Sequence, residues 1–323
     1  MNTVYIGGYT PDTGGAGTGV TVAARDASGA LTEVRSVAIS GPSFLAAHPS
    51  LPVLYAVGEA DHGTITAFSA TEDPERLATR SSGGSSPCHV AVTDNWLAVA
   101  NYADGMVALH SLDDEGLFTG PPLLFPGDGS GPDPDRQRGP HAHQAFFEGG
   151  ILFVTDLGAD QVRLWRVPGP GRTDFTTTEM KPVVLTPGIG PRHLASGLLG
   201  WYVTGELDGQ VHAFDRNWNP AGRFAASGRE GVNYPSHIQI HRDRLYVANR
   251  GPNTISVFDP ETQKMIAEVD CGGDWPRHFA IDGDDLYVAN QRSGDVVHFR
   301  LADGVPEPTG HVLAVPTPTC VLP

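Results

Sequence analysis

Short apolar runs, each bounded by Gly, Asp, Asn or Pro, recur along the whole chain. Some alternate between apolar and polar positions, others are continuously apolar, and they are rich in Val, Tyr and Phe, as in residues 64–68, 210–214 and 254–258. Such runs between turn-forming residues are typical of strands and hairpins. No stretch has the period of a long amphipathic helix, so the pattern predicts an all-β protein.

The runs are organised by a repeat. A segment with Pro, any residue, then His or a substitute, followed by an apolar run, occurs seven times, 41 to 53 residues apart. A repeat of this length with several short strands per unit is typical of a β-propeller blade. The seven copies begin at Pro42, Pro87, Pro140, Pro191, Pro235, Pro276 and Pro318.

A second apolar run, which ends in polar residues, follows in each full repeat. A turn and a third apolar strand come next, and a less regular fourth strand, as at residues 121–125, 182–186 and 267–271, completes a four-stranded sheet. The second runs are 54–59, 97–102, 152–158, 202–207, 245–251 and 286–291.

The two termini complement each other. Residues 1–9 resemble a second run without a Pro-x-His segment before it, and residues 316–323 resemble a Pro-x-His segment with nothing after it. Pairing residues 318–322 beside residues 3–9 completes a seventh blade and removes the unpaired sheet edges. We therefore predict one domain, residues 1–323: a seven-bladed β-propeller of four-stranded antiparallel blades, closed by its N- and C-terminal strands.

Composition and charge limit the binding partners and the cellular compartment expected for this protein. The formal net charge is -16, which argues against nucleic acid or an anionic membrane as partner. No membrane-span-length apolar run and no signal-peptide pattern is present, and the three cysteines have no metal-type spacing. We expect a cytoplasmic monomer or weak homo-oligomer, in which an anionic small substrate is held by local positive charge.

Blade geometry gathers polar residues at one face. Because neighbouring strands are antiparallel, the start of each first strand and the end of the second lie on the same side of the disc. A funnel lined by titratable groups from several blades is a natural place for catalysis. The residues expected there are His89, His143, Arg192, His193, His237, Arg277 and His278, with Glu59, Asn101, Asp156, Glu206, Asn249, Arg250, Asn290 and Gln291.

These residues also have structural interpretations. A repeated His can hydrogen-bond within its own blade, as in WD-type propellers, and His89 and His237 fit either role. The paired His141 and His143 are not required by a blade.

The extra arginines, Arg192 and Arg277, are not required by a blade either. We predict that they bind an anionic ligand, the alternative being ion pairs with neighbouring carboxylates. For Glu206 we predict a functional role, against hydrogen bonding within a turn.

The ordered motifs resemble the seven-bladed lactonase family, which includes propeller-type 6-phosphogluconolactonases and the fungal carboxy-muconate lactonizing enzyme. The motifs are GPHAHQ with DLGADQV, GPRH with GEL, SHI with VANRG, and PRHF with VANQ, and the resemblance covers the whole chain. Two departures are Phe44 in place of His and Thr204–Leu207 (TGEL) in place of a segment with Asn before Glu. Neither removes a residue to which we assign chemistry.

The resemblance implies residue roles. In the lactonizing enzyme a His and a Glu take part in proton transfer and arginines hold carboxylates, which maps proton transfer to His143, with His141 as the alternative, and to Glu206. It maps the arginines to Arg192 and Arg277. We accordingly expect His143, Glu206 and Arg192 to be catalytic, and substrate to be bound by His141, His193, His237, Arg250, Arg277, His278 and Asn290.

The chemistry expected is hydrolysis of a sugar lactone, 6-phosphogluconolactonase-like, without a cofactor. A base activates water, donors stabilise the oxyanion, and arginines match a phosphate or carboxylate. A muconate-type isomerase needs nearly the same groups. A propeller that binds a partner without catalysis is also consistent with these residues. So are two metal-dependent sites, a zinc site among the histidines and a calcium site formed by Asn101, Asp156, Glu206 and Asn249.

Overall fold

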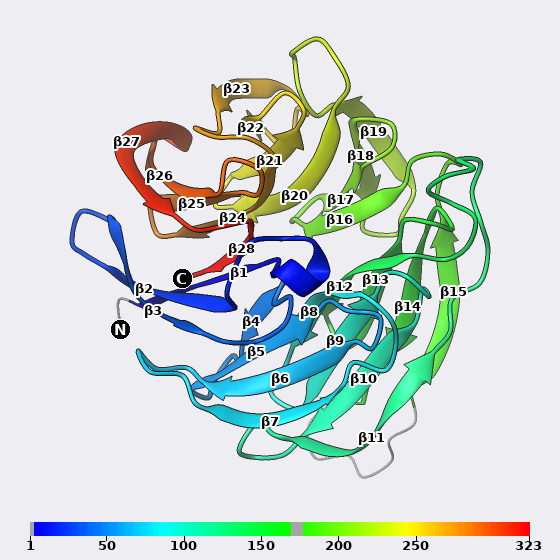
Figure 1. Ribbon diagram of the computed structural model, residues 1–323. Coiled ribbons are helices and arrows are strands. Elements are labelled where there is room, and N and C mark those ends of the chain that lie inside the picture. Colours follow the sequence, from blue (N-terminus) through cyan, green and yellow to red (C-terminus); the bar gives the residue numbers. More distant parts are fainter. Residues whose placement is uncertain (1–2, 169–176) are drawn as a thin grey trace. The chain divides into compact units, whose positions relative to one another are not determined.

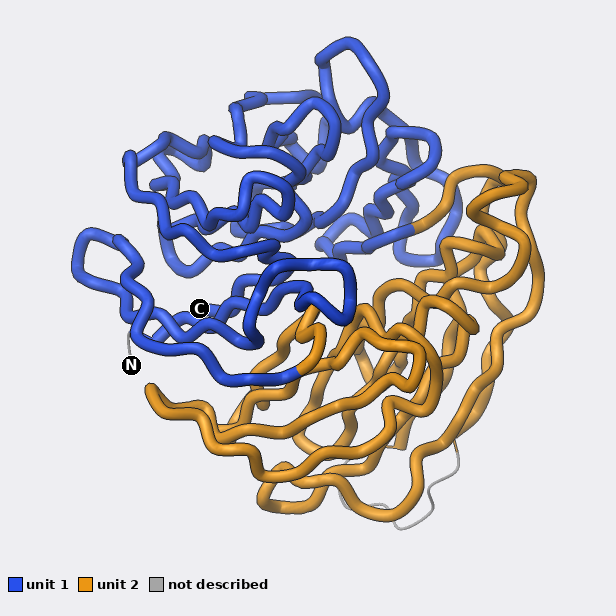
Figure 2. The backbone as a smooth tube through the Cα atoms, viewed as in Figure 1, with its two compact units in different colours: residues 1–39, 192–323 blue, residues 40–191 orange. Residues whose placement is uncertain are grey.

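The computed structural model describes residues 3–168 and 177–323. Their strands form seven four-stranded antiparallel sheets, and one short 3-10 helix, η1 (Pro11–Thr13), follows the first strand (Figure 1). The chain divides into two compact units, residues 1–39 with 192–323 and residues 40–191 (Figure 2). In both units every sheet has the four-stranded composition predicted from the repeat.

The first unit holds four sheets, in each of which chain neighbours pair as antiparallel hairpins. They are β28 (Pro318–Leu322), β1 (Thr3–Gly8), β2 (Val20–Arg25) and β3 (Leu31–Val37); β16 (Pro191–Ser196), β17 (Gly200–Gly205), β18 (Gln210–Asp215) and β19 (Pro220–Ala225); β20 (Tyr234–His241), β21 (Arg244–Arg250), β22 (Thr254–Phe258) and β23 (Met265–Asp270); and β24 (Pro276–Asp282), β25 (Asp285–Asn290), β26 (Asp295–Ala302) and β27 (Val305–Ala314).

The second unit holds three sheets of the same topology. They are β4 (Leu45–Ala47), β5 (Val53–Gly58), β6 (Thr64–Ser69) and β7 (Arg76–Ser81); β8 (Pro87–Val92), β9 (Trp96–Asn101), β10 (Val107–Leu112) and β11 (Phe118–Phe125); and β12 (Ala142–Glu148), β13 (Ile151–Asp156), β14 (Gln161–Arg166) and β15 (Thr178–Val184).

The repeated proline lies within three residues of the start of the first strand of each sheet, as predicted. In five of the seven copies the residue just before this proline has a positive φ, which turns the chain into the strand. A left-handed backbone is easy for glycine and uncommon for other residues. The five residues are Gly41 (φ 47°), Ser86 (φ 53°), Gly190 (φ 60°), Trp275 (φ 69°) and Thr317 (φ 46°).

The predicted pairing of the two termini is confirmed. Strand β28 pairs antiparallel with β1, with Tyr5 opposite Leu322, Ile6 opposite Val321 and Gly7 opposite Cys320. A Cβ on Gly8 would meet the Thr317 carbonyl oxygen at 2.6 Å, so a side chain at this position would push the two strands apart. The sheet that contains the chain's first strand therefore also contains its last.

Adjacent sheets within a unit are joined by apolar packing and by a recurring tyrosine. In the first unit, Tyr246, Ile255, Phe279 and Phe299 belong to one buried cluster that spans two sheets. The Tyr246 hydroxyl also donates to the Gly304 carbonyl at 2.8 Å, in a turn of the next sheet. Burial raises the pKa of this phenol to about 12, so it stays a hydrogen-bond donor at physiological pH.

The same hydrogen bond from a tyrosine hydroxyl to the next sheet occurs at other second strands. Tyr202 donates to Pro260 and Tyr287 to Gly29 in the first unit, and Tyr55 donates to Gly116 in the second. In each case the hydroxyl reaches a carbonyl in the turn between the third and fourth strands of the following sheet. These tyrosine hydrogen bonds therefore add directional contacts between adjacent sheets to the apolar packing, which has no preferred direction.

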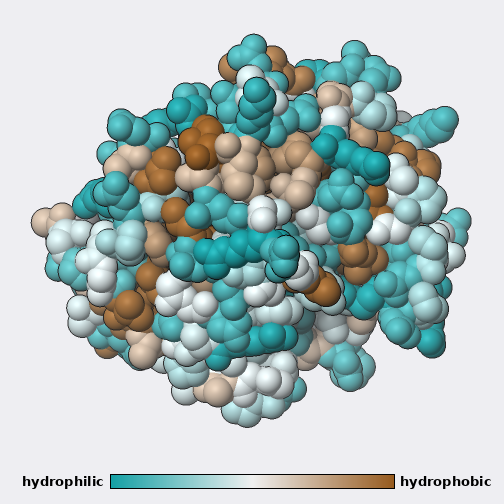
Figure 3. Space-filling view, turned by 90° about the horizontal axis from the view of Figure 1, so that it is seen from above, coloured by the Kyte–Doolittle hydropathy of each residue, from teal (hydrophilic) through white to brown (hydrophobic). Residues whose placement is uncertain are grey.

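Fourth strands and turns carry most of the exposed residues; β3, for example, is almost wholly exposed. The face shown in Figure 3 is mostly polar, with strongly hydrophobic residues scattered over it. Leu198 and Leu199, in the turn between β16 and β17, are among the most exposed apolar side chains. Across residues 3–168 and 177–323, no helix has the length and apolar character needed to cross a membrane.

Candidate active site

Three charged side chains of the first unit form a buried triad. Arg192 comes from β16, Glu206 directly follows β17, and Arg250 ends β21. Glu206 Oε2 lies 2.9 Å from Arg192 Nε and 2.7 Å from Arg250 Nη2. All three side chains are at most 6% exposed. One carboxylate oxygen thus serves two guanidinium groups, and the triad carries a net positive charge when all three groups are ionised.

Backbone carbonyls hold the two guanidinium groups of the triad. Arg192 Nη1 donates to the Ser236 carbonyl at 2.6 Å, and Arg250 Nε donates to the Tyr234 carbonyl at 3.0 Å. Both acceptors lie in β20, the first strand of the sheet that also contains Arg250. The arginines are therefore fixed by a strand edge as well as by Glu206, which preorganises their charge.

A row of histidines crosses the first strands of the same unit. His193 Nδ1 and His237 Nδ1 are 3.0 Å apart, so one donates and the other accepts. The His237 and His278 ring centroids are 4.2 Å apart. The structure thus brings together three of the four histidines that we predicted to bind substrate, whereas the fourth, His141, belongs to the second unit.

His278, the last histidine of the row, is neutral. The Val321 amide donates to its Nδ1 at 3.3 Å, which puts the ring proton on Nε2. Burial, with a contribution from the nearby Arg192 charge, lowers the pKa of His278 to about 3. The positive charge beside the row therefore resides on the arginines.

Arg277 lies in the same unit but has different partners. Its Nη2 donates to the Tyr9 hydroxyl at 2.8 Å, its Nη1 donates to Gln291 Oε1 at 3.3 Å, and its guanidinium lies over the Tyr9 ring. The side chain is partly exposed, unlike the triad arginines. Arg192 and Arg277, which we paired as an anion clamp, are therefore held by separate sets of contacts.

In the second unit, the two candidate proton-transfer histidines contact one tyrosine. His141 stacks on Tyr102 with centroids 4.6 Å apart, and His143 meets the same ring edge-on at 5.7 Å. His141 Nδ1 lies 2.7 Å from the Tyr102 carbonyl oxygen, so this nitrogen donates and Nε2 is the basic one. His143 is 5% exposed, whereas His141 is more open.

Asp156 anchors this histidine segment. Its Oδ1 accepts the His141 amide at 2.7 Å and the Ala159 amide at 3.1 Å. Its Oδ2 lies 3.8 Å from Arg163 Nη1, and Arg163 also donates to the Gly105 carbonyl at 2.7 Å. Burial raises the pKa of Asp156 and lowers that of Arg163. These contacts make Asp156 an anchor for the turn before β12.

The asparagines that end second strands bond to neighbouring turns. Asn290 is fully buried and donates to the Cys271 carbonyl at 3.2 Å and to Asp295 Oδ1 at 2.9 Å. Asn249 and Asn101 make comparable bonds to the following hairpin. Asn290 was predicted to bind substrate, but its contacts are those of a hairpin brace, and we leave it out of the proposed site.

The potential calcium ligands are divided between the two compact units. Asn101 and Asp156 belong to the second unit and Glu206 and Asn249 to the first. Within the described part of the chain, no three His, Cys, Asp or Glu side chains gather as a metal site would require. Neither the calcium set nor a histidine zinc set is assembled within either unit.

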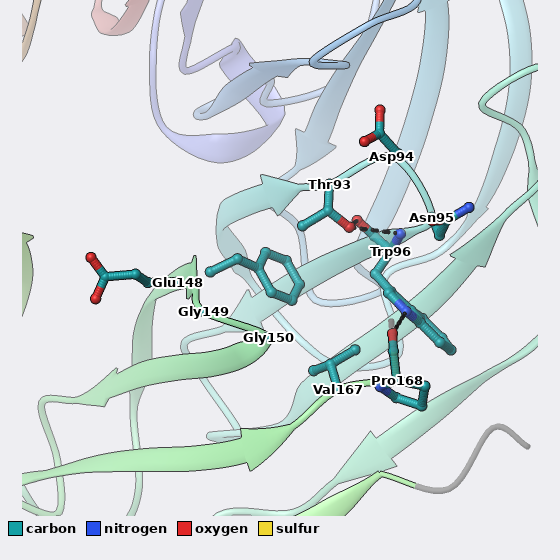
Figure 4. Close-up of a pocket in the computed structure, with 10 residues that line it drawn as sticks. Thr93, Asp94, Asn95, Trp96, Glu148, Gly149, Gly150, Val167 and Pro168 are labelled. Carbon is teal, nitrogen blue, oxygen red and sulfur yellow. Dashed lines mark hydrogen bonds between the residues drawn. The ribbon is translucent and has the colours of Figure 1, made fainter. Parts of the chain in front are cut away.

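A separate pocket of about 250 Å³ lies in the second unit. It is lined by the turns β8–β9 and β12–β13, with Trp96, Phe147 and Pro168, and the Trp96 indole donates to the Pro168 carbonyl (Figure 4). These turns lie at the opposite ends of the strands from His89 and His143. None of the predicted site residues lines this pocket.

Sequence reasoning missed several residues that support the site. Tyr102 orients His141, Tyr9 holds Arg277 together with the predicted Gln291, and the Trp275 ring lies 5.4 Å from the Arg250 Cζ. Tyr102 and Tyr9 follow directly after a second strand. At the ends of second strands only polar residues were predicted to belong to the site. The same position in the repeat also identifies its aromatic residues.

Comparison with known proteins agrees with this architecture. The family model described as "Lactonase, 7-bladed beta-propeller" matches residues 3–323. The 6-phosphogluconolactonase of Formosa agariphila is 31% identical over 245 residues, 70% of this chain and 69% of that protein. That of Bacillus subtilis is 30% identical over 252 residues, 71% of this chain and 70% of that protein.

Solved structures show the same fold. A protein from Lactobacillus plantarum has a TM-score of 0.89 at 25% identity, covering 99% of this chain and 98% of that chain. The periplasmic gluconolactonase of Pseudomonas aeruginosa has a TM-score of 0.88 at 24% identity, with the same coverage. The seven sheets, their clasped termini and the family match over almost every residue lead to one conclusion: the chain belongs to the seven-bladed β-propeller lactonase family.

Proposed function

We propose that this protein hydrolyses 6-phosphogluconolactone to 6-phosphogluconate. Membership of the lactonase family and the similarity to two proteins named 6-phosphogluconolactonase support lactone hydrolysis. The observation that carries the choice of an anionic substrate is the buried Arg192–Glu206–Arg250 triad, with its two guanidinium groups and single carboxylate. The excess positive charge is favourable for a phosphate or carboxylate ligand.

The charge distribution supports the same choice. The protein has a formal net charge of -16, so its overall field repels an anion. A buried site can still bind one if local cations outweigh nearby carboxylates, because charges interact more strongly away from water. Arg277, which is partly exposed and braced by Tyr9, is the proposed contact for the phosphate group.

Hydrolysis requires a base, an acid and a stabilised oxyanion. The water oxygen bonds to the lactone carbonyl carbon as the base takes one water proton, and the bond from that carbon to the ring oxygen then breaks. The ring oxygen leaves as a hydroxyl after receiving a proton, so one water is consumed and a hydroxy acid is released. Imidazole is suited to both proton transfers near neutral pH.

We assign the proton transfers to His143, with His141 as the alternative. His143 is supported by its buried place against the Tyr102 ring. His141 is supported by its hydrogen bond to the Tyr102 carbonyl, which orients Nε2 as the basic nitrogen. Single substitutions of the two histidines distinguish them.

We assign stabilisation of the oxyanion to Arg192. Its guanidinium is fixed by Glu206 and by the Ser236 carbonyl before substrate arrives. Donors that are already in place need little reorganisation as charge develops in the transition state. Glu206 then acts by holding Arg192 and Arg250, and the histidine row of His193, His237 and His278 forms the adjoining wall.

The test is lactone hydrolysis by the purified full chain, measured as acid release at constant pH after subtraction of spontaneous opening. The substrates are 6-phosphogluconolactone, neutral gluconolactone and a carboxylated muconolactone. We expect the phosphorylated lactone to have the highest kcat/KM. No hydrolysis above the spontaneous rate would contradict the proposal, and preference for the carboxylated compound would favour the isomerase alternative.

Two substitutions test the proton-transfer assignment in the same assay. His143→Ala should lower kcat by roughly 10²–10⁴, the usual contribution of general acid–base catalysis. The matched control is His110→Ala, since His110 is equally buried in the same unit but lies in β10. Full activity in His143→Ala, together with loss in His141→Ala, would transfer the role to His141.

Three broader properties are part of the proposal. We propose a single domain that works as a monomer or weak homo-oligomer, which light scattering of the purified protein tests. We propose a cytoplasmic location, supported by an odd number of cysteines, three, which are buried and have no metal-type spacing. The negative net charge supports a small-molecule substrate and no nucleic-acid or membrane partner.

A further inference from the structure

Trp275 has an unusual backbone conformation. Its φ of 69° lies in the left-handed region, where bulky residues are rare. It occupies the position just before the repeated proline, where the remaining positive-φ copies have Gly41, Ser86, Gly190 and Thr317. Since small residues make the same turn, the turn itself does not require an indole.

Neighbouring residues hold this backbone on both sides. The Trp275 amide donates to Asn253 Oδ1 at 3.0 Å, and the Trp275 carbonyl accepts the Gln291 amide at 3.0 Å. A strained conformation persists where its surroundings determine it in this way, and such residues cluster at functional sites. The two bonds fix the backbone from which the indole projects.

The indole contacts two guanidinium groups. The Arg292 Cζ lies 3.4 Å from the ring centroid, and the Arg250 Cζ lies 5.4 Å from it. Arg250 is the triad member that also bonds to Glu206 and to the Tyr234 carbonyl. The half-buried Trp275 therefore contacts both an exposed arginine and a buried one.

We infer that Trp275 is a positioning residue of the lactonase site, whose indole fixes the Arg250 guanidinium against Glu206. This inference rests on the proposed function for its kinetic consequence, which is weaker binding of a phosphorylated substrate when the ring is lost. An aromatic face attracts a cation strongly when both are shielded from water. The ring therefore removes orientations of Arg250 that lead away from the triad.

The kinetic test compares three variants. Trp275→Leu should raise KM for 6-phosphogluconolactone by about 2- to 30-fold, the range of a cation–π contact, with a smaller change for neutral gluconolactone. Trp275→Phe keeps an aromatic face and should restore most of the affinity. An unchanged KM for the phosphorylated lactone in Trp275→Leu would overturn the inference.

The matched control is Trp218→Leu. Trp218 also has a positive φ, 66°, is half-buried, and lies in the same unit, in the turn between β18 and β19. Its ring stacks on Trp201 at 4.8 Å, away from the triad. This variant should leave both KM values unchanged, so a general effect of removing a strained tryptophan would show itself in the control.

A second measurement needs no substrate. The measurement is a double-mutant cycle of Trp275→Leu and Arg250→Met. The change in the unfolding equilibrium constant of the double variant should differ by about 2- to 30-fold from the product of the changes in the two single variants. Additive effects would show that Trp275 does not hold Arg250. Coupling in a wild-type protein that hydrolyses no lactone would instead reject the proposed function and leave the positioning of Arg250 established.

Discussion

Replacing Glu206 by Gln tests the triad most directly. The substitution keeps the size of the side chain and removes its charge, which leaves two guanidinium groups buried around a neutral amide. The Arg192 and Arg250 side chains are 3% and 6% exposed, so water compensates for the lost charge only weakly. We therefore expect Glu206→Gln to destabilise the fold as well as to lower activity.

The expected size follows from the burial of the pairs. Removing one partner of a buried ion pair costs about 3–5 kcal/mol, because the other partner is left without its counter-charge. With an unfolding entropy of about 2.1 cal/mol/K per residue over 323 residues, this corresponds to a fall in Tm of roughly 4 to 7 °C. Activity should also fall, by up to roughly 10²–10³, because Arg192 loses the carboxylate that holds it in place to stabilise the oxyanion.

The assay is thermal and urea unfolding followed by circular dichroism. The control is Asp270→Asn, which breaks the Arg229–Asp270 pair, also 2.9 Å long but 43% and 77% exposed. An exposed pair contributes about 0–1 kcal/mol, so this variant should melt close to the wild type. A Tm for Glu206→Gln equal to that of the control would refute the argument.

A triple variant separates stability from function. Arg192→Met, Glu206→Leu and Arg250→Met together remove all the charges and leave none unpaired. Replacing a whole buried ion cluster by apolar residues is often neutral or stabilising by about 1–4 kcal/mol. We expect a protein as stable as the wild type that has lost its activity. Such a result shows that the triad is retained for binding and catalysis.

Three further predictions concern the anion contact, the buried histidine and the clasp. Arg277→Lys should lower the preference for a phosphorylated over a neutral lactone, since a point charge replaces a planar fork; an unchanged ratio removes Arg277 from phosphate binding. The pKa of His278 is about 3 in the fold against 6.5 unfolded, so only the unfolded chain gains a proton as the pH falls below 6.5, and stability falls. By pH 5 this difference in protonation should lower the free energy of unfolding by about 2 kcal/mol. When the pH is lowered to 5, His278→Phe should therefore lose about 2 kcal/mol less stability than the wild type in urea unfolding, and equal losses would contradict the lowered pKa of His278. Deleting residues 316–323 should lower Tm sharply, because β1 loses its neighbour and apolar surface is exposed; an unchanged Tm would show the pairing to be dispensable.

The sequence predicts the strands well because their signal is local. Alternation and turn residues are written in consecutive positions, and the repeated proline marks where each first strand begins. Even the pairing of β28 with β1, which joins residues more than three hundred positions apart, follows from two incomplete repeats that complement each other. Each of these inferences uses only the order of residue types.

The polar contacts are less predictable because they depend on distances between sheets. Arg250 and Glu206 are 44 positions apart, and nothing local shows that they bond. The pattern suggested a clamp of Arg192 with Arg277, but Arg192 pairs with Glu206 whereas Arg277 bonds to Tyr9. Asn290 and Arg250 both end second strands, yet one braces a hairpin and the other joins the triad.

The pairing of β28 with β1 also determines when this protein can finish folding during synthesis. Residues 3–8 leave the ribosome long before their neighbour in the sheet, residues 318–322, which is translated more than three hundred residues later. Until then the nascent chain carries β1 with one open edge, a template for pairing with another chain. Completion of this sheet must therefore wait until residues 318–322 have left the ribosome, and slow synthesis of the intervening chain prolongs the time during which two nascent copies can aggregate.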